Sequence, residues 1–293
     1  MNPSPVNLLN AETHYRRLNK LYKTLTPEEQ EFVKTQQLSA GHSTAYWQKL
    51  FQRLIVVDVL GSDLRRIYRR ARFWSVVAFI VAFLFLQGSS YTPVIWVLLA
   101  LSLFSSYRVK TCDNKDVDNN IRTGLVKVFQ VLALETRYIK LKLDVRALDK
   151  REITAKEQDG RNTKLEFYHV PLVQLSAKLK DGNTLNVRVQ DVICKRQRKQ
   201  ISRSGKRKTK IKFKGRRLIR VDLGLNPQRY AHRDGKLAPG CKIVSQPDGQ
   251  QKVVVQFKLK FEGKFKYLDA ENILKTVAKA YQQTKVVNRG KAA

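Results

Sequence analysis

One stretch of the chain without Asp, Glu, Lys, Arg or His limits the possible folds more than any other feature. It reads FWSVVAFIVAFLFL from Phe73 to Leu86 and, after Gln87–Ser90, YTPVIWVLLALSLFSSY up to Tyr107. A helix rises about 1.5 Å per residue, so roughly 17 to 25 residues cross a hydrocarbon core of about 30 Å. The two segments therefore predict a hairpin of two transmembrane helices that turns at Gln87–Ser90. The alternative is a buried helical hairpin of a soluble protein.

Basic residues flank this stretch on both sides, whereas the predicted turn has no Lys or Arg. They are Arg65, Arg66, Arg69, Arg70 and Arg72 before it and Arg108 and Lys110 after it. Because Lys and Arg accumulate on cytoplasmic loops, we expect both termini in the cytoplasm. The apolar run begins too far along the chain for a cleavable signal peptide. The expected location is the cytoplasmic membrane of a prokaryote, with the chain as a multi-pass protein.

The pattern predicts five regions along the chain. They are an N-terminal helical region (1–64), the transmembrane hairpin with its basic flanks (65–110), a linker and helix (111–136), a basic β-rich domain (137–287) and a tail (288–293).

The N-terminal region is predicted to be helical throughout. Thr26 offers a capping hydroxyl, and Pro27 and the acids after it suit a first helical turn. Farther along, apolar residues recur at three- and four-residue spacing: Trp47, Leu50, Phe51, Leu54 and Ile55. This amphipathic helix either lies on the membrane surface or packs in a small bundle, and its modestly basic polar face favours packing. The residues from Arg65 to Arg72 are expected to extend the first transmembrane helix.

The periodicity changes beyond Arg108. A polar stretch, Cys112–Asn120, is interpreted as a solvated linker, and a helix is predicted around Leu125–Leu134. Alternating apolar residues then predict a strand at Ile139–Val145 with one buried face.

Three β-hairpins and a final helix are expected after that strand. The hairpins are Val173–Leu179 with Leu185–Val189 about Asp181–Asn183, Ile211–Phe213 with Ile219–Leu223 about Lys214–Arg217, and Val253–Phe261 with Phe265–Tyr267 about Glu262–Gly263. Asp269 is expected to cap the helix that follows. The predicted fold is therefore a membrane α-helical hairpin with an N-terminal helical segment and a C-terminal α+β, mainly antiparallel β, cytosolic domain.

The charge of the chain indicates an anionic partner. Lys and Arg total 57 against 24 Asp and Glu, a formal net charge of +33. The densest run extends from Lys195 to Arg220 and contains fourteen cations and no acid. We predict that all fourteen bind anions: Lys195, Arg196, Arg198, Lys199, Arg203, Lys206, Arg207, Lys208, Lys210, Lys212, Lys214, Arg216, Arg217 and Arg220.

Alternation within this run predicts a row of ammonium groups. Lys208, Lys210, Lys212 and Lys214 would lie on one face of a strand about 7 Å apart. Several of the arginines would extend the patch through a flexible Ser-Gly loop. The alternative is an edge strand that uses lysines to prevent aggregation, but that does not require fourteen cations without an acid.

The leading hypothesis is a membrane-anchored binding or scaffolding module whose basic cytosolic domain contacts anionic lipid headgroups or an acidic protein. A membrane-tethered nucleic-acid-binding protein is the alternative, although Phe213 is the one aromatic residue in the run. A channel subunit is disfavoured because no ionisable residue lines the apolar segments. The chain has no catalytic, metal-binding or cofactor-binding motif, and its three cysteines have neither disulfide nor CxxC spacing.

Overall fold

The computed structural model describes residues 6–85, 92–117, 121–160, 162–201, 205–233, 235, 237–246, 249–263 and 268–287. The chain forms two compact units. The first comprises residues 1–35 and 50–117, and the second comprises residues 36–49 and 118–293.

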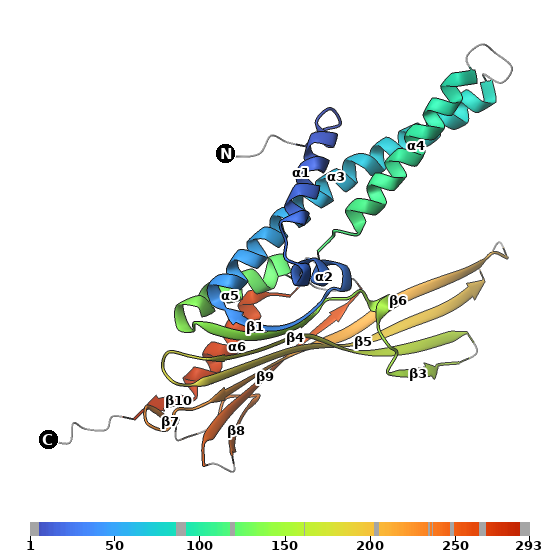
Figure 1. Ribbon diagram of the computed structural model, residues 1–293. Helices are drawn as coiled ribbons and strands as arrows, with labels where there is room; N and C mark the ends of the chain where they lie inside the picture. Colours follow the sequence, from blue (N-terminus) through green and yellow to red (C-terminus); the bar gives the residue numbers. More distant parts are fainter. Residues whose placement is uncertain are drawn as a thin grey trace. The chain divides into compact units, whose positions relative to one another are not determined.

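The first unit is helical. It contains α1 (Ala11–Lys23), α2 (Pro27–Thr35), most of α3 (Thr44–Phe85) and α4 (Thr92–Asp113). Figure 1 shows α3 and α4 side by side. α1 packs on both helices through a shared cluster of buried side chains: Ala11, Tyr15, Leu18, Val57, Leu64, Tyr68, Val109 and Cys112. The unbroken α3 confirms that its arginines continue the helix that contains Phe73.

The start of α2 follows the predicted capping pattern. The Thr26 hydroxyl accepts from the Glu29 backbone N–H at 3.3 Å, and the Glu29 carboxylate accepts from the Thr26 N–H at 3.0 Å. These reciprocal bonds form a capping box. After α2, Gln36 takes a left-handed conformation with φ of 57°, which turns the chain out of the helix.

The helical prediction for residues before Tyr68 is wrong at β1 (Gln37–Ser43). This strand belongs to the second unit and pairs antiparallel with β2 (Tyr138–Asp144), from Gln37 opposite Asp144 to Ser43 opposite Tyr138. Its composition gives no alternation of strongly apolar residues. An added Cβ on Gly41 would meet the Tyr138 hydroxyl of β2. The strand depends on this partner, which lies about a hundred residues away in the sequence.

The apolar face of the amphipathic part of α3 is buried within the protein. Trp47, Leu50, Phe51 and Leu54 are each at most 1% exposed. Trp47 belongs to the second unit, where its ring lies 5.9 Å from that of Phe129 and its Nε1 donates to the Ile139 carbonyl at 3.1 Å. The burial agrees with the packing alternative, but Trp47 packs within the sheet-containing unit and not in a bundle of helices.

The second unit is a mainly antiparallel sheet with helices. The strand order is β1-β2-β4-β5-β6-β9-β8, with β3 added to β4, and β7 and β10 form a separate pair. The bounds are β3 Ala155–Gln158, β4 Thr163–Lys178, β5 Thr184–Ile201, β6 Arg207–Gly224, β7 Tyr230–His232, β8 Cys241–Ser245, β9 Gln251–Glu262 and β10 Thr284–Val286. The helices are α5 (Val126–Glu135), preceded by a π-turn at Ile121–Leu125, and α6 (Ala270–Gln282), with a short 3₁₀ turn at Leu148–Lys150.

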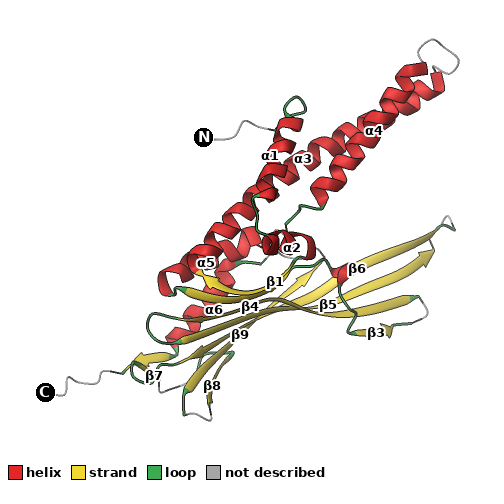
Figure 2. Ribbon diagram, viewed as in Figure 1, coloured by secondary structure: helices red, strands yellow, loops and turns green. Residues whose placement is uncertain are grey.

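The sheet has two chemically different faces. We call the buried one the inner face: Ile139, Leu175, Val187, Val221 and Val255 lie on it and are at most 2% exposed. Figure 2 shows α5 and α6 on one side of the sheet, and α6 packs against β6 and β9. The residues between these apolar positions form the opposite side, the outer face.

The first predicted hairpin and the final helix are confirmed. β4 and β5 are joined at Asp181–Asn183, where the Tyr281 hydroxyl of α6 donates to Asp181 at 2.7 Å. Asp269 caps α6 by accepting from the Glu271 N–H at 3.0 Å. In the third hairpin the first strand is observed as β9, whereas the predicted partner Phe265–Tyr267 lies outside the described residues.

The second predicted hairpin is wrong. Residues 207–224 form one continuous strand, β6, which pairs with β5 along its whole length. Gly215 does not form a turn: it lies on the inner face, where an added Cβ would be 2.5 Å from the ring of Phe261. Since Ile211, Phe213 and Ile219 share the same phase of the alternation, the strand passes through the expected turn without a break.

Candidate anion-binding surface

The predicted basic run forms the far end of the β5–β6 hairpin. β4 ends opposite Arg198, and β9 ends opposite Lys214, whereas β5 and β6 continue to pair up to Ile201 and Arg207. We call this end, residues 194–201 and 207–214, the arm (Figure 1). Arg196, Arg198 and Arg207 thus lie on paired strands, whereas residues 202–204 of the predicted Ser-Gly loop, Arg203 among them, lie outside the described residues.

Strand alternation divides the described cations of the run between the two faces. Lys195, Lys199, Arg207 and Arg217 are on the inner side, and Lys206 is in the bend before β6. Eight cations are on the outer side: Arg196, Arg198, Lys208, Lys210, Lys212, Lys214, Arg216 and Arg220.

Arg217 does not belong to an exposed anion-binding surface. Its side chain is 4% exposed, and it donates two hydrogen bonds of 2.8 Å to Asp191, which is 3% exposed. A buried guanidinium requires such a partner because an unpaired charge in the interior is very unfavourable. The structure therefore corrects the prediction that Arg217 binds an external anion.

Lys195 is also paired on the inner side. It donates to Glu166 at 2.7 Å, and the Tyr168 hydroxyl donates to the same carboxylate at 2.9 Å. The bond from Lys195 lowers the pKa of Glu166, and the same bond raises the pKa of Lys195. This cation is therefore balanced within the protein.

The outer face is different because cations lie directly opposite cations. Two such pairs are on the arm, Arg196 opposite Lys212 and Arg198 opposite Lys210. Two more lie on the central sheet: Arg188 opposite Arg220 and Arg216 opposite Lys260. Side chains opposite each other on one face have Cβ atoms about 5 Å apart, and like charges there are destabilising.

Acidic side chains balance a minority of these charges. Asp222 accepts from Arg220 at 2.8 Å, Glu262 lies 2.9 Å from Lys214, and Asp159 lies 3.3 Å from Arg196. Among the residues that the structure describes, no carboxylate pairs with the other outer cations of these strands: Arg188, Arg198, Lys208, Lys210, Lys212, Arg216, Lys258 and Lys260.

Several members of this surface were not predicted from the sequence. Lys140 and Lys142 of β2, Arg188 of β5, and Lys258 and Lys260 of β9 are exposed on the same outer face. Each stands at a polar position of an alternating strand, which is a signal present in the sequence. Only the strand order brings them next to the predicted run.

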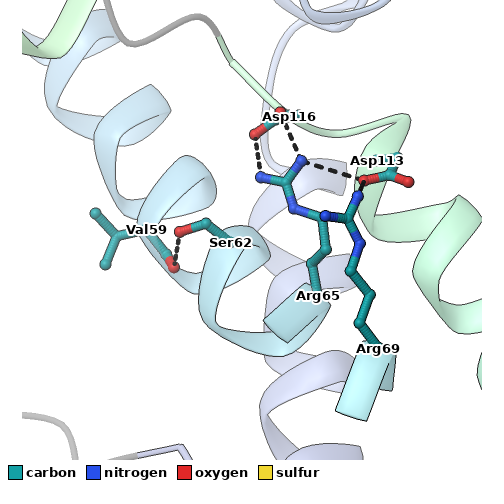
Figure 3. Close-up of polar contacts among 6 residues, drawn as sticks. All are labelled: Val59, Ser62, Arg65, Arg69, Asp113 and Asp116. Carbon is teal, nitrogen blue, oxygen red and sulfur yellow. Dashed lines mark hydrogen bonds and ion pairs between the residues drawn. The ribbon is translucent and has the colours of Figure 1, made fainter. Parts of the chain in front are cut away.

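A second charged cluster joins α3 and α4 in the first unit (Figure 3). Arg65 donates two bonds of 2.8 Å to Asp116 and one of 3.1 Å to Asp113, which also accepts from Arg69 at 3.3 Å. Cys112 is buried. The predicted solvated linker, Cys112–Asn120, therefore makes structural contacts as far as Asp116. Asp118 and Asn120 lie outside the described residues.

One helix among the described residues is long and apolar enough to cross a membrane. It covers Pro93–Asp113, with a mean hydropathy of 1.3 and 22% of the apolar window buried. The described part of α3 ends at Phe85. Its apolar segment, which begins at Phe73, is therefore shorter than α4.

Comparisons of the chain with family models, with curated proteins and with solved structures give no match.

Proposed function

We propose that this protein is a membrane-anchored binding module whose outer face binds anionic lipid headgroups. The four like-charged cross-strand pairs of the outer face carry this proposal. Cations placed opposite each other make the fold less stable than alternating charges would. Fold stability alone therefore does not explain these positions, whereas binding of an external anion does.

We propose further that the apolar parts of α3 and α4 form a two-span hairpin with both termini in the cytoplasm. Their large apolar side chains are exposed, with Phe73 at 60% and Trp96 at 67%. Such a continuous apolar surface needs an apolar environment. Arg65, which precedes the apolar part of α3, pairs with Asp116 just beyond α4, as residues at the open end of such a hairpin would.

A lipid surface suits the distribution of the charges. The unbalanced cations are spread over β2, β5, β6 and β9 rather than along one groove. Each Lys or Arg close to an anionic leaflet contributes about 1 kcal/mol. A membrane anchor in the same chain would keep the local lipid concentration high, so modest intrinsic affinity is sufficient.

An acidic protein or a nucleic acid is the alternative partner. The major groove of DNA admits a two-stranded β-ribbon, and the end of the arm beyond β4, where Lys199–Ile201 pair with Arg207–Thr209, is such a ribbon. Both alternatives are outcomes of the binding experiment below.

The binding experiment uses the full-length protein in nanodiscs of neutral lipid. The nanodiscs are mixed with neutral vesicles, with vesicles containing phosphatidylglycerol, with an acidic polypeptide and with duplex DNA, each across a salt series. We expect binding to acidic vesicles to persist near physiological salt. DNA binding through six to ten phosphates would fall about a thousandfold or more between 50 and 200 mM salt.

Two variants of equal charge provide the matched comparison. One replaces Lys208, Lys210, Lys212 and Lys214 with Gln and should lose most of the binding to acidic vesicles. The control replaces four exposed helical lysines with Gln and should bind as the parent does; they are Lys20, Lys23, Lys34 and Lys49. If the arm variant keeps parental binding to acidic vesicles and loses only DNA or polypeptide binding, the lipid proposal is wrong.

The topology has a separate test. A cysteine introduced at Ser89 should react with a membrane-impermeant maleimide added outside intact cells, whereas reporters fused to both termini should report the cytoplasm. Labelling of the second unit from outside would contradict the proposed hairpin.

A further inference from the structure

A small hollow lies within the outer face, directly beyond the arm along β6. Its volume is about 270 Å³, and its lining comes from β5, β6 and β9. Four cations and two amide side chains surround Leu218: Arg188, Arg216, Arg220, Lys258, Gln190 and Gln256.

The strand register explains this convergence. Leu218 lies opposite Gln190 on one side and opposite Lys258 on the other. The row on one side of Leu218 contains Arg188, Arg220 and Gln256, and the row on the other side contains Arg216. Rows two residues apart along a strand are separated by about 7 Å, so cations face the same space from both ends of the hollow.

The charge in the hollow is not balanced by the protein. Arg220 has Asp222 as a partner at 2.8 Å. Within the described part of the chain, Arg188, Arg216 and Lys258 pair with no carboxylate. Three uncompensated cations fit a dianionic ligand better than a singly charged one, because each repulsion between them is relieved by the ligand's charge.

Size and hydrogen-bonding groups narrow the ligand class. The volume is slightly below that of ordinary small-molecule pockets, which begin at about 300 Å³. Guanidinium forks bind phosphate oxygens in a bidentate manner, and the Gln190 and Gln256 amides supply further donors. A terminal phosphate satisfies all of these conditions, whereas the phosphodiester of a polymer or of a simple acidic lipid carries one charge.

We infer that this hollow binds a phosphomonoester or pyrophosphate group and makes the outer face selective for partners that carry one. This inference rests on the proposed function, since it names the headgroup chemistry that the same face recognises. The group can belong to a lipid or to a small soluble molecule, and the experiment distinguishes these sources.

The test uses the full-length protein in neutral nanodiscs. Vesicles containing phosphatidic acid, a phosphomonoester, are compared with phosphatidylglycerol vesicles of equal surface charge. Binding of free pyrophosphate is measured by calorimetry. We expect a preference of about tenfold or more for the phosphatidic acid vesicles, which corresponds to one or two charge-assisted hydrogen bonds. If free pyrophosphate competes with the phosphatidic acid vesicles, the lipid headgroup and the soluble ligand bind the same site.

Two charge-matched variants locate the preference. Arg188→Gln combined with Arg216→Gln should remove it, together with pyrophosphate binding. Arg196→Gln combined with Arg198→Gln removes the same charge from the arm and should weaken binding to both vesicle types while the preference remains. Arg216→Lys keeps the charge but not the fork, and should reduce the preference.

The failures of the two proposals are distinguishable. Equal binding of the parent to both vesicle types, with no pyrophosphate binding, overturns the hollow as a site and leaves the lipid-binding proposal standing. Pyrophosphate binding that the hollow variant loses, in a protein that binds neither vesicle type, supports the hollow for soluble ligands and overturns the lipid proposal.

Discussion

Removing the partner of a buried ion should destabilise the second unit strongly, and Arg217 provides the test. Its guanidinium makes two 2.8 Å bonds to Asp191, and both side chains are at most 4% exposed. Arg217→Met would leave the Asp191 carboxylate buried without its cation. Breaking such a pair from one side costs about 3–5 kcal/mol.

The expected shift in melting temperature follows from the size of the unit. For a domain of roughly 150–250 residues, 1 kcal/mol corresponds to about 2–4 °C, so Arg217→Met should lower the melting temperature by about 6–20 °C. The assay is thermal unfolding of the full-length protein in mild detergent, followed by far-ultraviolet circular dichroism. Arg217→Met combined with Asp191→Leu removes both charges, and it should recover most of the loss or exceed the parent.

An exposed ion pair between β6 and β9 gives the matched control. Lys214 and Glu262 lie 2.9 Å apart but are 64% and 73% exposed, so Lys214→Met should leave the melting temperature unchanged. If Arg217→Met also melts with the parent and instead weakens anion binding, Arg217 is part of the binding surface and the reasoning from burial fails.

Three further predictions concern local features of the second unit. Asp269→Ala removes the α6 cap and should cost about 0.5–2 kcal/mol in the same melting assay. Gly215→Val places a side chain against the buried ring of Phe261 and should cost about 1–3 kcal/mol, measured by denaturant unfolding. Because Lys195 lowers the pKa of Glu166 below its ordinary 4.5, the stability from this pair is fully present above pH 4.5 and is lost as the pH falls through the folded-state pKa. Glu166→Gln should therefore flatten the acid limb of a melting-temperature profile.

The sequence alone predicts those elements of the fold for which the local pattern and the long-range packing agree. The alternation around the turn at Asp181–Asn183 and the cap at Asp269 predicted a hairpin and a helix that the structure contains. β1 was missed because nothing local distinguishes Gln37–Ser43, and its pairing with β2 closes a loop of about a hundred residues.

The candidate surface was predictable in part. The run of cations was evident, but Arg217 was grouped with it although it shares the phase of Ile219 and Val221, which are buried. The pattern predicts a turn that includes Gly215, whereas this residue accommodates the Phe261 ring from the neighbouring strand. The contribution of Lys258 required the register of β9 against β6, which long-range pairing decides.

The unbroken course of β6 has a consequence for the thermodynamics of association. A disordered basic tail loses backbone freedom when it meets its partner, at about 1–2 kcal/mol for each residue that becomes fixed. In this protein the strand pairing between Lys199–Ile201 and Arg207–Thr209 has already fixed the backbone before any partner arrives. Binding by the arm therefore restricts mainly side-chain rotamers, and for the same charge its affinity should exceed that of a flexible peptide of identical sequence.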